Sequence, residues 1–111
     1  MSKRRVVITG LGALTPVGND VPTMWANLIA GKSGAAAITL FDATRFKTKF
    51  ACEVKNFDPS AILGKKDARR MDRFTQFAVA CAKEAIEDSG LAITPENAPR
   101  LGVMMGTGIG G

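Results

Sequence analysis

The strongest periodic pattern in the chain runs from residue 72 to residue 88. Apolar side chains recur there at a helical spacing and form one stripe, made of Phe74, Phe77, Ala78, Cys81, Ala82 and Ala85. Gly90 follows as a C-terminal stop signal, so the pattern predicts a helix over residues 72–88. Because alanine and cysteine are prominent in the stripe, we expect this helix to approach another surface closely and to be buried inside a larger parent fold.

A second helix is predicted to start after Asp20, a suitable N-cap residue, with Pro22 in its first turn and Gly31 at its end. Its apolar face would consist of Met24, Trp25, Leu28 and Ile29. Two shorter helical stretches are predicted over residues 59–63 and 65–70.

Three segments have the composition of β-strands. Residues 4–9 contain a β-branched apolar run at residues 6–8, which is typical of a central strand covered on both faces of a sheet. Residues 49–54 alternate over a short stretch, and residues 101–105 form another apolar run, whereas residues 32–48 read as an irregular connection. Since the predicted strands and helices alternate along the chain, the expected fold class is α/β.

Composition limits the class of protein. The chain has 111 residues, of which 46% are hydrophobic and 23% are charged, so we expect residues 1–111 to belong to one globular domain without an internal boundary. No apolar stretch approaches the roughly 20 residues that span a bilayer. The basic start is followed by too short an apolar run for a signal peptide. These features predict a cytoplasmic protein that does not bind membranes.

The residues available for chemistry are few. The sequence contains no histidine and therefore no imidazole base. Cys52 and Cys81 lie far apart without CxxC spacing, and no histidine could complete a metal site with them, so no metal site is predicted. No cofactor is predicted either. We expect both thiols to lie in the core without a disulfide. Neither is placed at a predicted helix N-terminus, where an activated cysteine is commonly found.

Two glycine-rich segments follow predicted strands and invite comparison with dinucleotide-binding loops. Residues 10–15 lack the third glycine of such a loop, and the next helix starts too late to present its N-terminus to a pyrophosphate. Residues 106–111 match GxGxxG literally, but no helix and no ribose-binding acid follow them in this sequence. A tight turn with close backbone approach is therefore the favoured interpretation of the second segment.

Positive charge is concentrated in one place. The formal net charge is +5, and five basic residues fall within nine positions: Lys65, Lys66, Arg69, Arg70 and Arg73. Counted from Lys66, the three arginines follow at spacings of three, four and seven, which places them on one face if the stretch is a continuous helix. Two interpretations of this pattern have equal support. It is either a solvated helix face or a surface that binds an acidic protein or a phosphate-bearing ligand. Nucleic acid is disfavoured, because the patch is small and no aromatic residues interleave with it.

An ordered set of short motifs resembles one known family. The set comprises Arg4-Arg5-Val6-Val7-Ile8-Thr9-Gly10-Leu11-Gly12, Thr15-Pro16-Val17-Gly18, Trp25, Gly31-Lys32-Ser33-Gly34, Phe50-Ala51, Arg70-Met71-Asp72, Asp88-Ser89-Gly90-Leu91 and Gly106-Thr107-Gly108-Ile109-Gly110-Gly111. In this order the motifs resemble the β-ketoacyl-acyl carrier protein synthases, and most closely the elongating type II enzymes of bacterial fatty acid synthesis. The resemblance covers the entire chain but only the N-terminal portion of the family's length.

The resemblance implies a partial thiolase-like fold, namely the N-terminal part of one half of a layered α-β-α-β-α sandwich. It implies an acyltransferase that condenses an acyl thioester with malonyl-carrier protein, and a homodimer for the full-length enzyme. The family's cysteine nucleophile and two histidines match no residue up to Gly111. The resemblance therefore implies that this chain holds no catalytic residue and is inactive alone.

Two sets of site residues are carried over from the resemblance. Lys66, Arg69 and Arg70 match basic positions that face the acidic acyl carrier protein, which brings an acyl or malonyl group on its phosphopantetheine arm. Ile109 matches the side chain that lines the acyl-chain pocket. Two alternatives remain open from the residues themselves: a nucleotide-binding α/β domain that uses residues 106–111, and a non-catalytic module that binds carrier protein.

Overall fold

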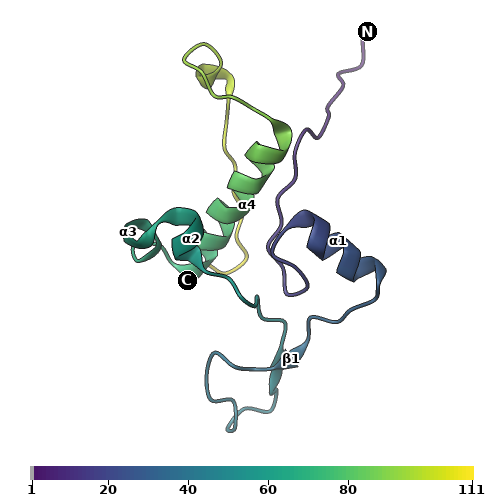
Figure 1. The fold of residues 1–111 in the computed structure, drawn as a ribbon, viewed down its shortest axis with the longest axis vertical. Helices are drawn as coiled ribbons and strands as arrows, with labels where there is room; N and C mark the ends of the chain where they lie inside the picture. The colour runs from purple at the N-terminus through teal and green to yellow at the C-terminus, as the bar shows by residue number, and fades with distance from the viewer. Residues whose placement is uncertain (1) are drawn as a thin grey trace. The chain divides into compact units, whose positions relative to one another are not determined.

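The computed structural model describes residues 2–111 (Figure 1). The elements are α1 (Val21–Ile29), β1 (Ala36–Ala37), β2 (Phe50–Ala51), α2 (Pro59–Leu63), α3 (Lys65–Ala68), α4 (Arg73–Ser89) and the short 3₁₀ helix η1 (Ala98–Arg100). They belong to two compact units. One unit consists of residues 13–58, and the other joins residues 2–12 to residues 59–111.

Helix α1 opens the first unit and confirms the prediction of a helix behind Asp20. The Asp20 carboxylate accepts a hydrogen bond of 2.7 Å from the backbone N–H of Thr23, which satisfies one of the unpaired donors of the first turn. Pro22 lies in that turn, where a missing N–H costs nothing. Gly31 follows the helix with φ of +66°, a backbone conformation that favours glycine.

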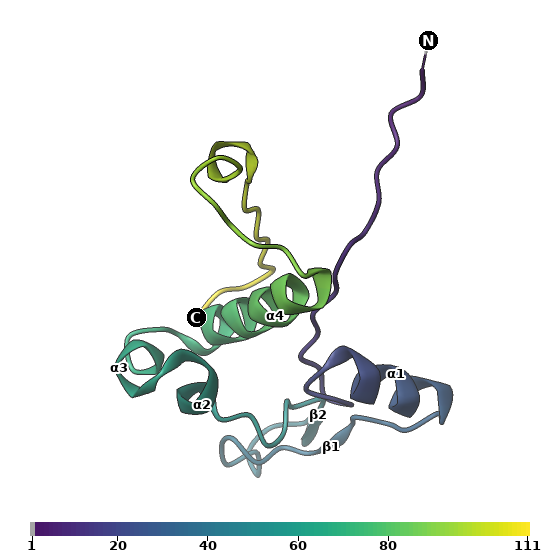
Figure 2. The same ribbon diagram turned by 45° about the horizontal axis from the view of Figure 1, so that its top comes forward.

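Strands β1 and β2 form the sheet of the first unit, seen side by side in Figure 2. They pair antiparallel, with Ala36 opposite Ala51 and Ala37 opposite Phe50. The strand predicted at residues 49–54 therefore exists but is confined to two residues, because the opposing strand is equally short. The partner strand comes from the segment that was expected to be an irregular connection.

Helix α4 dominates the second unit and confirms the strongest periodic signal in the sequence. It runs from Arg73 to Ser89 and ends at Gly90, whose left-handed φ of +65° matches the predicted stop signal. Helix α2 packs against both α3 and α4. Helix α3 ends at Ala68, two residues before the end predicted from sequence.

The small residues of α4 meet the backbone of residues 10–12, as the composition of the stripe predicted. A Cβ atom on Gly12 would lie 1.9 Å from the carbonyl oxygen of Cys81, and one on Gly10 would lie 2.2 Å from that of Ala85. The backbone N–H of Leu11 also donates a hydrogen bond of 3.0 Å to the Asp88 carboxylate. Close approach thus requires glycine on one side and small side chains on the other.

The strands predicted at residues 4–9 and 101–105 are not formed. Both segments lack a paired strand among residues 2–111, and Val6 and Val103 are each 92% exposed. An apolar β-branched run becomes a strand only where neighbouring strands supply ladder hydrogen bonds and cover its faces. The helices and small sheet that are present are elements of a partial α/β fold.

Little of the described chain is buried. Ala68, at 7% exposure, is the one buried apolar residue among residues 2–111. The predicted core position of both cysteines is wrong for this structure, because Cys52 is exposed and Cys81 is half-buried. Helix α4 has no buried residue within the described chain, and its burial inside a larger fold stays a prediction. No helix within these residues is long and apolar enough to cross a membrane.

Candidate functional site

The basic cluster lies on α3 and on the turn that follows it. Lys66 is on α3, Arg69 caps the helix, and Arg70 is in the turn before α4. The helix ends because the backbone N–H of Arg70 donates to the Asp67 carbonyl three residues earlier, at 3.0 Å, and so tightens the last turn. The cations are thus not on one continuous helix face, which corrects that part of the sequence analysis.

Lys66, Arg69 and Arg70 form what we term the basic patch, and all three are exposed. Ala68 lies between them in sequence and is buried, so the short helix turns its methyl group inward and leaves its charged neighbours in solvent. Arginine guanidinium groups in such a position can bind carboxylates or phosphates with two parallel hydrogen bonds.

Arg73 belongs to a different element from the basic patch. It is the first residue of α4, and its guanidinium carbon lies 4.9 Å from the ring centroid of Phe77, one helical turn later. This cation–π geometry directs the arginine toward the aromatic ring of its own helix. The sequence spacing of seven between Lys66 and Arg73 is therefore not maintained as a single helical face.

Ile109 lies in the irregular glycine-rich segment after η1 and is 97% exposed. The segment returns to the beginning of α4. A Cβ atom on Gly110 would lie 3.0 Å from the Phe74 ring, and one on Gly111 would lie 3.2 Å from the side chain of Asp72. Ile109 is thus presented next to the start of α4.

An apolar groove, which was not predicted from the sequence, runs along α4 in the second unit. Its volume is about 620 Å³, and its walls come from α4 and from residues 103–107. Phe74 and Phe77 line one side and Val103 and Met105 the other. The stripe of α4 and the apolar run at residues 101–105 were both visible in the sequence, but their juxtaposition depends on the chain reversal between them.

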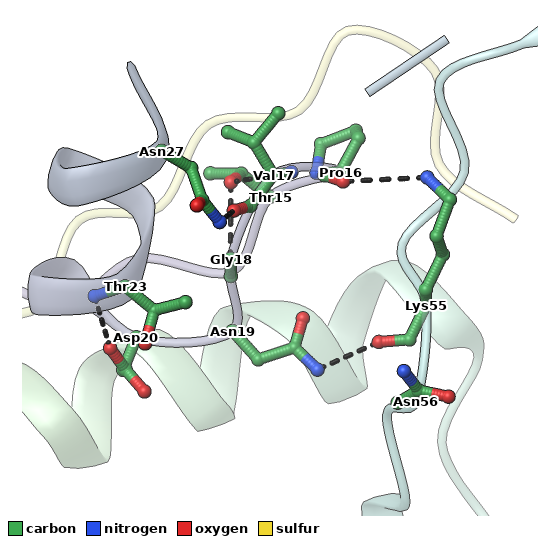
Figure 3. Close-up of a pocket in the computed structure, with 10 residues that line it drawn as sticks. All are labelled: Thr15, Pro16, Val17, Gly18, Asn19, Asp20, Thr23, Asn27, Lys55 and Asn56. Carbon is green, nitrogen blue, oxygen red and sulfur yellow. Dashed lines mark hydrogen bonds between the residues drawn. The ribbon is translucent and has the colours of Figure 1, made fainter. Parts of the chain in front are cut away.

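A polar pocket of about 310 Å³ lies in the first unit, between the loop that precedes α1 and residues 55–56 (Figure 3). The loop closes on itself, because Thr15 and Gly18 exchange backbone hydrogen bonds of 2.8 and 3.2 Å. The side-chain amide of Asn27 donates to the carbonyl of Val17.

Lys55 ties this loop to the sheet. Its ammonium group donates to the carbonyl oxygens of Gly34 at 3.0 Å, Glu53 at 3.1 Å and Pro16 at 3.4 Å. Its own carbonyl accepts a hydrogen bond of 2.7 Å from Asn19 (Figure 3). The three donors of the ammonium group are therefore occupied by the protein, and the network acts as a structural tie for the loop.

Acidic groups of the first unit serve the same structural purpose. The backbone N–H of Thr23 at the start of α1 lowers the pKa of Asp20, and the Thr39 hydroxyl lowers the pKa of Glu53. Hydrogen bonding to the charged form is the cause in both cases. Among residues 2–111 no group of three or more potential metal ligands is found.

The comparison with protein families decides the assignment. Residues 3–111 match the family described as "Beta-ketoacyl synthase, N-terminal domain". The chain belongs to the β-ketoacyl synthase family. This confirms the resemblance that was drawn from the ordered motifs.

Individual relatives of this β-ketoacyl synthase chain agree with the family match. It is 57% identical over 111 residues to a "3-oxoacyl-[acyl-carrier-protein] synthase 2" of Coxiella burnetii, a match that covers all of this chain and 27% of the relative. The protein of the same name from Vibrio harveyi is 56% identical over the same shares of the two chains. The chain thus spans about a quarter of the length of these relatives.

A solved structure supports the fold of this β-ketoacyl synthase chain. "The ishigamide ketosynthase/chain length factor" is 41% identical, with a TM-score of 0.72, and the match covers 82% of this chain and 23% of the other. The predicted fold class, a partial thiolase-like α/β fold, is therefore confirmed.

Proposed function

We propose that this chain is the N-terminal part of a 3-oxoacyl-acyl carrier protein synthase that elongates fatty acids. Two relatives with this name match the chain over its whole length at 56% and 57% identity, and the family match covers residues 3–111. We place the enzyme in the cytoplasm as a homodimer. In this proposal, residues 1–111 are one part of a single synthase domain.

The basic patch is the docking surface for the acyl carrier protein. Lys66, Arg69 and Arg70 are exposed on a short helix and its turn, and this observation carries the proposal. An acidic carrier would be steered to such a surface by electrostatic attraction, which raises the association rate and fixes orientation. The carrier would present its acyl or malonyl group on the phosphopantetheine arm.

The proposed reaction is a decarboxylative condensation. An acyl group moves from the carrier thiol to a cysteine of the enzyme, and malonyl-carrier protein then loses carbon dioxide. The resulting carbanion attacks the acyl carbonyl, a carbon–carbon bond forms and the enzyme thioester breaks. We assign none of these steps to residues 2–111, because they contain no histidine and no cysteine at a helix N-terminus. Ile109 would supply one wall of the acyl pocket.

Charge reversal tests the docking surface. The variant Lys66→Glu/Arg69→Glu/Arg70→Glu should weaken binding of labelled acyl carrier protein by tenfold or more, measured by fluorescence anisotropy at low salt. The matched control Arg45→Glu/Lys47→Glu/Lys49→Glu reverses three exposed cations in the other unit. Its net charge changes by the same amount. Equal loss in both variants, or no loss in either, would contradict the assignment of the patch.

Two other functions are separable by experiment. A non-catalytic module would bind carrier protein through the same patch but would not contribute to condensation when joined to the remaining length of the synthase. A nucleotide-binding domain would bind NAD or ATP at residues 106–111. Titration of the chain with each nucleotide separates this alternative, because saturable binding would favour it.

A further inference from the structure

The turn that carries Arg69 and Arg70 is held by one side chain of α4. The amide nitrogen of Gln76 donates to the carbonyl oxygens of Ala68, at 2.8 Å, and Met71, at 3.2 Å. These carbonyls lie immediately before and after the two arginines in the sequence. A single half-buried amide therefore bridges both sides of the turn, and both of its N–H groups have acceptors within reach.

The other end of the same segment is tied to α4 as well. The ammonium group of Lys83 donates a hydrogen bond of 2.8 Å to the carbonyl oxygen of Ile62, close to the end of α2. Gly64, with φ of +80°, then leads into α3. Because Gln76 and Lys83 are seven residues apart, they lie on the same face of α4. Helix α4 thus holds the segment before and after the basic patch.

We propose that Gln76 is a positioning residue for carrier docking, acting through the backbone of Arg69 and Arg70. This inference rests on the proposed function of the basic patch. Helix α3 has only four residues, too few to be stable alone, and its last carbonyl, that of Ala68, accepts a hydrogen bond from the Gln76 side chain. By ordering the turn beforehand, Gln76 reduces the conformational entropy that the two arginines lose when the carrier binds.

The substitution Gln76→Met tests this role, because methionine has a similar length and helix propensity but no donor. We expect carrier affinity to fall about three- to tenfold, the effect of losing one or two neutral hydrogen bonds. Backbone amides of residues 65–71 should exchange faster with deuterium, while the exchange rates of the amides in α4 should be unchanged. The control Thr75→Val, a polar-to-apolar change at the neighbouring position, should leave carrier affinity unaltered.

A double-mutant cycle separates positioning from a merely structural role. In an Arg69→Ala/Arg70→Ala background, Gln76→Met should weaken carrier binding no further, because the side chains that it positions are absent. The same loss in both backgrounds would overturn the inference. If charge reversal of the patch abolishes binding while Gln76→Met does not weaken it, the inference fails and the docking surface stands. If neither change matters, the docking surface itself is wrong.

A measurement on the unaltered chain covers the case in which Gln76→Met prevents folding. Titration with carrier protein, followed by NMR, should shift the side-chain amide resonance of Gln76 together with the backbone resonances of Arg69 and Arg70. An unmoved Gln76 resonance, with both arginines shifting, would overturn the inference without any substitution.

Discussion

Gly12 leaves no space for a larger side chain where residues 10–12 cross α4. The Cβ of an alanine would lie 1.9 Å from the carbonyl oxygen of Cys81, a backbone atom that cannot rotate away. Helix α4 already presents small residues there, so an added methyl group at residue 12 could be accommodated only if the helix and residues 10–12 moved apart. Gln76 is likewise a single residue with a local effect, because its amide holds the backbone on both sides of Arg69 and Arg70.

The substitution Gly12→Ala should destabilise the second unit by about 1–3 kcal/mol, the usual cost of overpacking, or disrupt the crossing altogether. Gly102→Ala is the matched control, because no atom lies within 4 Å of a Cβ built there and its φ is not positive. Urea denaturation followed by circular dichroism gives the free energy of unfolding of each variant. Equal stability of the two variants would show that the close contact is absent in solution.

At the scale of elements, helix termini are determined by local chemistry. Helix α1 begins where Asp20 caps it, and α4 ends at the left-handed Gly90. The end of α3 is different, because the tight hydrogen bond from Arg70 to Asp67 is accompanied by the contacts of Gln76 from another helix. The capped start of α1 and the capped end of α4 were predicted to within one residue, whereas the end of α3 was predicted two residues too late.

Acid should weaken α1 through Asp20. The N–H of Thr23 holds the pKa of Asp20 below its ordinary value of 3.8, so the cap contributes fully above that pH. Its contribution is lost as pH falls through the lower folded value. Asp20→Asn should retain the cap and remove this acid dependence, and Asp20→Ala should lose the cap at neutral pH.

Hydrogen exchange of residues 21–24 measures this effect locally. A local measurement is needed because Asp42, Glu53 and Glu96 also have lowered pKa values and add to any global acid transition. Identical exchange in the wild-type, Asp20→Asn and Asp20→Ala chains at every pH would show that Asp20 does not cap α1.

At the scale of the whole molecule, the chain exposes most of its apolar residues. Its sequence is 46% hydrophobic, yet Ala68 alone is buried among the described residues. The chain covers 27% of its Coxiella burnetii relative, and the matched solved ketosynthase is likewise much longer. The groove along α4 and the segments 4–9 and 101–105 are apolar, as surfaces that another part of a protein covers usually are.

The 111-residue chain should show no condensation activity by itself. Cys52 is an exposed residue after β2 and Cys81 lies in the middle of α4, so neither is at a helix N-terminus, where a nucleophilic cysteine is commonly found. Release of labelled carbon dioxide from malonyl-carrier protein measures the reaction, with the Coxiella burnetii synthase as positive control. Turnover above background, lost on Cys52→Ala or Cys81→Ala, would overturn the assignment of catalysis to other parts of the synthase.

The sequence by itself determined the helices, the concentration of charge and the family. Caps such as Asp20 and Gly90 act within a few residues, and the ordered motifs need no knowledge of contacts. Only the tertiary structure decided that residues 4–9 and 101–105 are not strands here, because a strand exists through hydrogen bonds to a partner. It likewise decided that Gln76 supports the basic patch, because that contact requires α4 to lie against the end of α3.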